Sequence, residues 1–153
     1  MINLSRKSDY GFYLLTLLAE DGGALSLRQV AEQHDLSFQY LQEVAQTLRR
    51  AGFLSAARGA RGGYRLSKPA GEVSALEVIA ALEGAFFAET CMSSDGSYQC
   101  VRADRCRSKR GLSALKEKVL GVLATTSLAD IVAENRPRPS TKLRQPALTG
   151  ATR

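Results

Sequence analysis

The sequence predicts a mainly α-helical protein that carries one small β-hairpin. Apolar residues recur at helical spacing in four segments of residues 10–82 and again in residues 112–132. Two short runs of strand-like composition flank a glycine-rich connection at residues 58–63. The 153 residues are 44% hydrophobic, which suits one domain with a buried core and is too high for a chain that is disordered throughout.

The first predicted helix follows from apolar residues at the i, i+4, i+7 and i+8 positions of one face. These residues are Tyr10, Leu14, Leu17 and Leu18. Gly22 and Gly23 end the helix. The apolar run of residues 10–19 stops at two acidic residues, so it is too short to span a membrane and is interpreted as part of the fold, not as a signal peptide.

A second and a third helix are expected next, joined by a tight turn at residues 34–36. Ser26 followed by Gln29 is a capping-box pattern, which starts the short second helix. Ser37 can cap the third helix, and Gly52 occupies the left-handed position after it. The expected inward residues are Leu27, Val30 and Ala31 in the second helix and Leu41, Val44, Ala45 and Leu48 in the third.

Residues 53–57 and 64–67 are expected to form the two strands of the hairpin. Ser74 with Glu77 then predicts a capped fourth helix, which ends at Gly84. Its expected inward residues are Leu76, Ile79, Ala80 and Leu82. Farther along, a narrow stripe with alternating steps of three and four predicts a long helix that packs against another helix. The stripe consists of Leu112, Leu115, Val119 and Val122, and a short amphipathic segment follows at residues 128–132.

The charge of the chain is unevenly distributed. The formal net charge is +6, of which residues 136–153 carry five bases and no acid, so the preceding residues contribute only +1. Residues 44–71 hold six bases and no acid, between acidic flanks. The body is therefore nearly neutral, with one local basic stretch that suggests a nucleic-acid partner. The tail has few large apolar residues and is expected to be disordered or ordered by a partner.

The order of helix, short helix, turn, helix and basic hairpin is that of a winged helix-turn-helix, whose later helix enters the major groove of DNA. Glutamines on its outward face can donate and accept at base edges, and arginines can neutralise phosphates. The candidate DNA-binding residues are Ser37, Gln39, Tyr40, Gln42, Arg49, Arg50, Arg58 and Arg61. Arg58 or Arg61 can enter the minor groove from the glycine-rich wing. The alternative is an ordinary helical hairpin with a solvated basic loop; a phosphate-binding P-loop is disfavoured because no Gly-Lys-Ser/Thr follows.

The three cysteines have the pattern Cys91-x8-Cys100-x5-Cys106. An odd number without an export signal favours a reducing, cytoplasmic setting over a disulfide framework. Zinc sites favour closer pairs and four ligands, whereas iron–sulfur clusters accept wider spacing and a non-cysteine ligand. A structural thiol or two with a spare remains open as an alternative. The single histidine, His34, lies in the helix-turn-helix and is interpreted as a turn residue or a phosphate contact rather than a ligand.

Residues 1–134 resemble the bacterial iron–sulfur transcription regulators of the IscR, NsrR and RirA type. The resemblance rests on four stretches: residues 4–10, residues 36–41, the wing at residues 58–66, and the three-cysteine segment before a long helix. It implies a homodimer whose long helix crosses that of its partner. It also places the recognition-helix positions on Gln39 and Gln42 and the minor-groove arginine on Arg58.

The same resemblance implies a 2Fe-2S or 4Fe-4S cluster held by Cys91, Cys100 and Cys106. The histidine that completes the cluster in IscR-like members is Lys109 here, which cannot serve while protonated. In NsrR-like members an aspartate of the other subunit takes this place, and Asp9 occupies that position. The eight-residue gap is longer than is usual in IscR and NsrR, which leaves the nuclearity and the stimulus open.

These observations predict four segments. They are a winged helix-turn-helix DNA-binding domain (residues 1–84), a cluster-binding segment (85–107), a dimerisation helix with a short C-terminal helix (108–135) and a basic, proline-containing tail (136–153). The expected function is that of a dimeric repressor that senses cluster status, redox state, iron or nitric oxide. Alternatives are a cluster-free thiol-switch or zinc-binding regulator and, more remotely, a small iron–sulfur redox protein. No Ser-His-Asp, HExxH or Walker pattern supports an enzyme, and no feature predicts a membrane partner.

Overall fold

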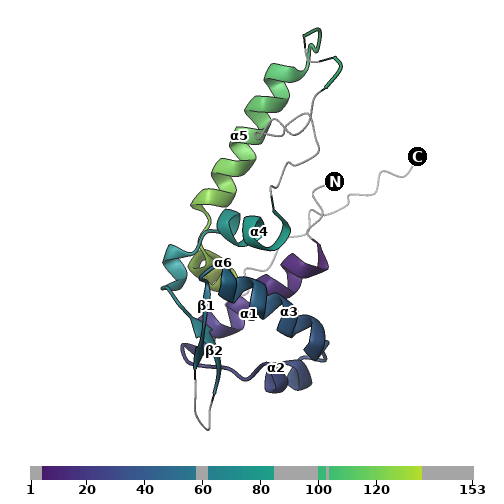
Figure 1. Ribbon diagram of the computed structural model, residues 1–153. Coiled ribbons are helices and arrows are strands. Elements are labelled where there is room, and N and C mark those ends of the chain that lie inside the picture. Colours follow the sequence, from purple (N-terminus) through teal and green to yellow (C-terminus); the bar gives the residue numbers. More distant parts are fainter. Residues whose placement is uncertain (1–4, 58–61, 85–99, 103, 136–153) are drawn as a thin grey trace, which may run out of the picture.

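The computed structural model describes residues 5–57, 62–84, 100–102 and 104–135. A group of helices forms a compact body, from which one long helix and one hairpin project (Figure 1). The elements are α1 (Arg6–Asp21), α2 (Leu27–Gln33), α3 (Phe38–Arg50), β1 (Leu54–Ala57), β2 (Gly63–Leu66), the 3-10 turn η1 (Ala70–Glu72), α4 (Ala75–Glu83), α5 (Lys109–Thr125) and α6 (Leu128–Asn135). The mainly α-helical class with a two-stranded antiparallel wing is confirmed.

Helix α1 lies at the centre of the helical body and contacts α3, α4 and α6. Its buried residues are Ser8, Gly11, Leu14, Leu15 and Leu18. Tyr10 and Leu17, also expected on the buried face, pack against this core but remain half-buried. Gly11 explains part of the difference: a Cβ at this position would lie 2.4 Å from Leu82 Cδ1, so α1 and α4 approach along a glycine.

Helices α2 and α3 form the helix-turn-helix, and the inward residues expected for both are buried. The Oγ of Ser37 accepts a hydrogen bond from the backbone N–H of Tyr40 (3.4 Å), so the predicted cap of α3 is confirmed. The capping box expected at Ser26 is absent, since its side chain accepts no capping bond. The preceding residue, Leu25, is held by paired backbone hydrogen bonds to Tyr64, which fixes the direction of the chain before α2.

The hairpin pairs Leu54 with Leu66 and Ala57 with Gly63 in antiparallel register. It is attached to the helical body by the bridge between Leu25 and Tyr64, where both backbone hydrogen bonds are 2.9 Å long. A Cβ on Gly63 would lie 2.1 Å from the carbonyl oxygen of Leu25, so only glycine permits this approach. The hairpin is thereby fixed relative to the start of α2.

Helix α4 begins with the predicted capping box between Ser74 and Glu77 and ends at Gly84. Its buried residues are Ala75, Val78, Ile79 and Leu82. The expectation that Leu76 and Ala80 face inward is therefore wrong: Leu76 is half-buried and Ala80 is exposed. Helix α4 contacts α1, α3 and α5. Because it has neighbours on several sides, its buried residues do not follow a single apolar stripe.

The chain returns to the helical body after α5. Leu128, the first residue of α6, is 1% exposed, and its N–H donates to the carbonyl oxygen of Val73 (2.8 Å). The N–H of Ala75 donates in turn to the oxygen of Thr126 (2.8 Å). Helix α6 packs against α1 and η1, so the core joins the two ends of the described chain. Helix α5 itself buries no residue and extends away from this body (Figure 1).

Candidate nucleic-acid interface and cysteine segment

The outward face of α3 is the first part of the candidate interface. Its side chains are polar and all exposed: Gln39, Gln42, Glu43, Gln46, Arg49 and Arg50. The opposite face buries Leu41, Val44, Ala45 and Leu48, each 0% exposed. This core anchor holds the polar face in one orientation, as a helix that enters the major groove requires.

Tyr40, another predicted DNA-binding residue, is half-buried against α1. Its ring meets the ring of Tyr10 edge to face, with centroids 4.9 Å apart and an interplanar angle of 84°. Tyr40 thus fixes the first turn of α3 on α1 in this structure. Arg58 and Arg61, the two wing candidates, lie outside the described residues.

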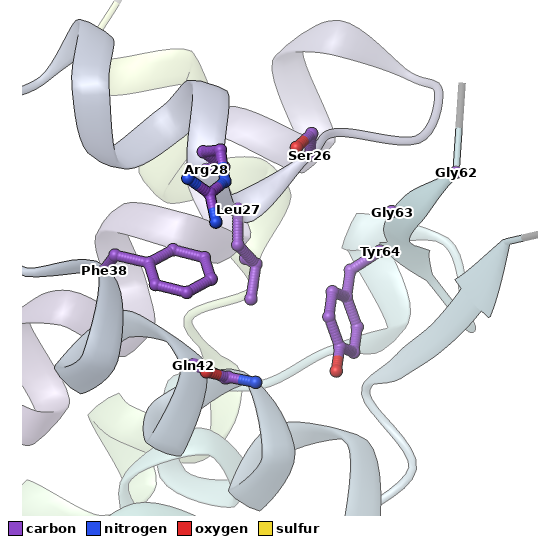
Figure 2. Close-up of a pocket in the computed structure, with 8 residues that line it drawn as sticks. All are labelled: Ser26, Leu27, Arg28, Phe38, Gln42, Gly62, Gly63 and Tyr64. Atoms are coloured by element: carbon purple, nitrogen blue, oxygen red, sulfur yellow. The ribbon is translucent and has the colours of Figure 1, made fainter. Parts of the chain in front are cut away.

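A groove of about 300 Å³ separates the helix-turn-helix from the hairpin (Figure 2). In Figure 2, Phe38 and Arg28 stand on one side, Tyr64 stands on the other, and Leu27 and Gln42 lie between them. The remaining lining residues are Ser26, Gly62 and Gly63. We call this cavity the recognition groove. It opens beside the polar face of α3, where a base edge would arrive.

Arg28 is a candidate that the sequence analysis missed. Its guanidinium carbon lies 5.3 Å from the centroid of the Phe38 ring, a cation–π contact. The ion pairs among the described residues are Lys68 with Glu77 and Lys116 with Glu117, so no described carboxylate pairs with Arg28. The sequence offered a signal for Arg28, because it is the single Lys or Arg in the otherwise acidic residues 9–43.

A second hollow, of about 550 Å³, lies at the other end of α3. It is lined by Gln46, Arg49, Arg50 and Tyr64. Two guanidinium groups beside a tyrosine and an amide form a cationic surface suited to phosphate oxygens. Tyr64 borders this hollow as well as the recognition groove, so it is a further residue that the sequence analysis missed.

The predicted cluster-binding segment (residues 85–107), here called the cysteine segment, is described only in part. Cys91 lies outside the described residues, whereas Cys100 and Cys106 are half-buried free thiols. Within the described ranges, no group of three His, Cys, Asp or Glu side chains is positioned to hold a metal ion. Free thiols followed by several arginines have the chemistry that a thiolate-ligated cluster requires, so the donors present fit such a group. Lys109 is the first residue of α5 and is exposed.

Asp9 is exposed and borders a groove of about 340 Å³ on the surface of α1. The other lining residues are Phe12, Tyr13, Thr16, Leu17, Glu20 and Asn135. Cys106 shortly precedes α5, whose first turn lies at the end that extends from the helical body, whereas Asp9 belongs to α1 within that body (Figure 1). The start of α5 and helix α1 of one chain are therefore apart.

Glu83 joins the beginning of α1 to the end of α4. Its carboxylate accepts hydrogen bonds from the Oγ of Ser8, which is 0% exposed, and from the backbone N–H of Ser5 (3.1 Å). The bond from Ser8, followed by those from Ser5, lowers the pKa of Glu83 below its ordinary value of 4.5. The chain enters the cysteine segment directly after α4, so this contact connects that segment to the helix that carries Asp9.

His34 occupies the turn between α2 and α3, as expected from the sequence. The hydroxyl of Tyr13 lies 2.8 Å from its Nδ1, and the two rings meet edge to face at 5.4 Å. The residue is exposed, and these contacts join it to α1. Its place agrees with a turn residue.

Residues 4–134 match a family of iron-dependent transcriptional regulators, Rrf2. The chain belongs to the Rrf2 family. It is similar to CymR, the global cysteine regulator of B. subtilis, with 31% identity and a TM-score of 0.72 over 88% of this chain and 98% of that chain. S. aureus CymR shares 32% identity, with a TM-score of 0.66 over 84% of this chain and 96% of that chain.

IscR of T. potens is 29% identical, with a TM-score of 0.67 over 86% of this chain and 87% of that chain. The resemblance drawn from the sequence motifs is therefore confirmed at the level of the family. As a member of the Rrf2 family, this protein is a transcription regulator, and the winged helix-turn-helix is its DNA-binding fold.

Within the described ranges, no helix combines the length and the apolar character needed to cross a bilayer.

Proposed function

We propose that this protein is a homodimeric repressor that reads DNA with α3 and the hairpin and responds to the state of its cysteine segment. The observation that carries the DNA-binding part is the outward face of α3, where six polar side chains are exposed opposite a fully buried apolar face. Gln39 and Gln42 contact base edges, and Arg49 and Arg50 contact phosphates. Arg28 adds a phosphate contact on the other side of the recognition groove. Arg58 or Arg61 extends the wing into the minor groove.

Helix α5 supplies the dimer interface. Leu115 is 51% exposed and Val122 is 64% exposed, and Leu112 and Val119 of the same stripe are only half-buried. The described residues leave much of this apolar stripe exposed, and such a stripe gains free energy when it packs against a second copy. Two copies related by a twofold axis present two α3 helices to two DNA half-sites, so their separation controls affinity.

The proposed ligands of an iron–sulfur cluster are Cys91, Cys100 and Cys106 of one chain and Asp9 of the other. Helix α1, which carries Asp9, lies apart from the start of α5, which Cys106 shortly precedes, and this arrangement supports a carboxylate supplied by the partner subunit. Such a cluster supplies one-electron redox chemistry and sensitivity to oxidants or nitric oxide. A carboxylate is a weaker ligand than a thiolate, which suits a centre whose loss or modification is the signal.

The contact of Glu83 with Ser5 and Ser8 couples the cysteine segment to the DNA-binding fold. If Asp9 held the cluster, a change in its ligation would free α1, which packs directly against α3. A change of ligation at the cysteines would reach α1 through α4, because Glu83 of α4 accepts hydrogen bonds from Ser5 and Ser8. Both routes change the spacing of the two α3 helices, which is the quantity that a two-half-site operator detects.

A cluster-free thiol regulator is the second candidate. Similarity to two CymR proteins supports it, including an oxidized form of S. aureus CymR that is 32% identical. In this case Cys91, Cys100 and Cys106 act as thiol switches or bind zinc. The DNA-binding part of the proposal is the same for both candidates.

Anaerobic purification followed by absorbance, iron and sulfide analysis distinguishes the two candidates. The cluster proposal predicts coloured protein with iron and acid-labile sulfide in equal amounts. Colourless protein with stoichiometric zinc, or with no metal, contradicts it and favours the second candidate.

Asp9→Ala is expected to make the cluster labile or to alter its spectrum. Glu20→Ala, which lines the same groove, is the matched control. An unchanged spectrum for Asp9→Ala removes Asp9 from the ligand set.

A further inference from the structure

We propose that the recognition groove receives the 5-methyl group of a thymine whose adenine partner is read by Gln42. The inference rests on the proposed DNA-binding function and adds a base preference to it. It concerns the slot between the Phe38 ring and the Tyr64 ring, with Leu27 and Gln42 between them (Figure 2). Each operator half-site would then contain one T·A pair at a fixed position.

Two of the residues that line the groove, Leu27 and Phe38, are apolar. Leu27 is 7% exposed and joins the core, so its side chain forms a fixed apolar floor. Phe38 is 39% exposed, although it stands beside the most polar face of the molecule. The exposed part of the Phe38 ring would gain free energy if an apolar group of a ligand packed against it. A ligand that carries an apolar group therefore suits this slot better than a purely polar one.

Thymine brings such a group. In the major groove, the C5-methyl of thymine is the single apolar projection among the four bases. It lies on the same edge as the N6 and N7 atoms of the paired adenine, separated from them by the thymine O4. Gln42 is exposed, lines the groove between the two rings and carries an amide that can pair with these two adenine atoms. One base pair therefore satisfies the polar and the apolar parts of the groove together.

Two contacts hold the walls of the groove in place. Arg28 covers the Phe38 ring at 5.3 Å, which limits the rotation of both side chains. Tyr64 is fixed through its backbone, because its N–H and carbonyl both bond to Leu25 at 2.9 Å. A wall that is already ordered loses little entropy on binding, so removal of one methyl group is expected to have a measurable effect.

The test uses the full-length protein and a duplex selected from a random DNA library. Each thymine is replaced in turn by deoxyuridine, which removes the methyl group and keeps base pairing unchanged. At one symmetric position per half-site, affinity is expected to fall about fourfold, the effect of one buried methyl group. The other thymines of the duplex are the controls. Affinity that is unaffected by deoxyuridine at every position overturns the inference and leaves the proposed DNA-binding function intact; a library that yields no bound duplex overturns both.

A comparison of 5-methylcytosine with cytosine distinguishes methyl recognition by the groove from adenine recognition by Gln42. At the sensitive position, 5-methylcytosine paired with guanine is expected to bind about fourfold better than unmethylated cytosine, although both lack the adenine. Phe38→Ala is expected to abolish the difference between thymine and deoxyuridine. Because this ring is exposed, its truncation leaves the core residues untouched, and a thermal melting curve verifies the fold. If Phe38→Ala and Tyr64→Ala both retain the full methyl effect, the methyl group is read elsewhere and the assignment to this groove is wrong.

Discussion

Helices α3 and α5 are both amphipathic, yet they use their apolar sides differently. Helix α3 has 13 residues and buries four apolar side chains completely, each 0% exposed. Helix α5 has 17 residues and buries none, and Leu115 and Val122 are 51% and 64% exposed. The apolar side of α3 is satisfied within its own chain, so only its polar side is available to a ligand. The described residues leave much of the apolar side of α5 exposed, which is why we propose that a second copy covers it.

The largest expected effect comes from charges placed on the α5 stripe. In Leu115→Glu/Val122→Glu, each dimer loses four apolar contacts at about 1.5 kcal/mol each, or about 6 kcal/mol in total. The result is expected to be a folded monomer with greatly weakened affinity for a two-half-site duplex, measured by light scattering and by titration. Arg110→Glu/Ala114→Glu, which places two charges at exposed positions on the other side of the same helix, is the control. A double variant that remains dimeric removes α5 from the interface.

One truncation in α3 and one in α5 test whether each apolar side packs within its own chain or against a second copy, measured by the free energy of unfolding. Leu48→Ala leaves a cavity in the core and is expected to lower the free energy of unfolding by about 2–5 kcal/mol. Leu115→Ala removes a side chain that is half exposed in one chain, so its effect is expected to depend on protein concentration. Urea unfolding at two concentrations distinguishes these outcomes. If both losses are independent of concentration, Leu115 is not at a subunit interface.

A substitution at Gly63 tests how the hairpin is attached to the helical body through the bridge between Leu25 and Tyr64. In Gly63→Ala the added Cβ would lie 2.1 Å from the carbonyl oxygen of Leu25, so the bridge to Tyr64 must open. The expected loss is about 1–3 kcal/mol of stability, together with weaker DNA binding. Gly71→Ala is the matched control, because no atom lies within 4 Å of its added Cβ. Equal stability of the two variants would show that the bridge is not needed.

The helix caps predict a smaller difference. Ser74→Ala breaks the capping box with Glu77 and is expected to cost about 1 kcal/mol, whereas Ser26→Ala removes no capping bond and is expected to cost less than about 0.3 kcal/mol. Thermal melting of the two variants provides the measurement. Equal losses contradict the assignment of the two caps.

The smallest effect concerns the pH dependence of the contact at Glu83. Hydrogen bonds from Ser8 and Ser5 lower the pKa of this group in the folded state. Its contribution to stability is therefore fully present above the ordinary value of 4.5 and is lost as the pH falls through the lowered folded value. The melting temperatures of the wild-type protein and Glu83→Gln are expected to differ above about pH 5 and to converge toward pH 3. A difference that grows as the pH falls contradicts this contact.

Most elements of the fold were predictable because their signals are local. Ser37 and Ser74 begin helices as expected, and Gly22 and Gly84 end them. The buried faces of α1 and α4 were less predictable, since each helix has neighbours on several sides. Gly11 and Ser8 are buried although neither is strongly apolar, because close packing selects small residues there. The proposed domain boundaries and cluster ligands, Cys91 among them, remain predictions.

The candidate interface was predictable along α3 and not across the groove. The helical period of 3.6 residues and the polar character of Gln39, Gln42, Arg49 and Arg50 place these residues on one face of α3, independently of tertiary contacts. Arg28, Phe38 and Tyr64 come from three different elements, and no spacing in the sequence relates them. Their meeting depends on the turn at Asp35, where φ is 51°, and on the bridge from Leu25 to Tyr64.

The sequence by itself thus determined the order of elements, the family resemblance and the polar face of α3, because propensity, capping and periodicity act within a few residues. The tertiary structure alone decided that α6 returns to the core, that α5 keeps an exposed apolar stripe and that a groove with an aromatic wall opens beside α3. Each of these depends on contacts between residues distant in the chain. Such contacts are chosen by shape and burial in the folded state, which no local pattern encodes.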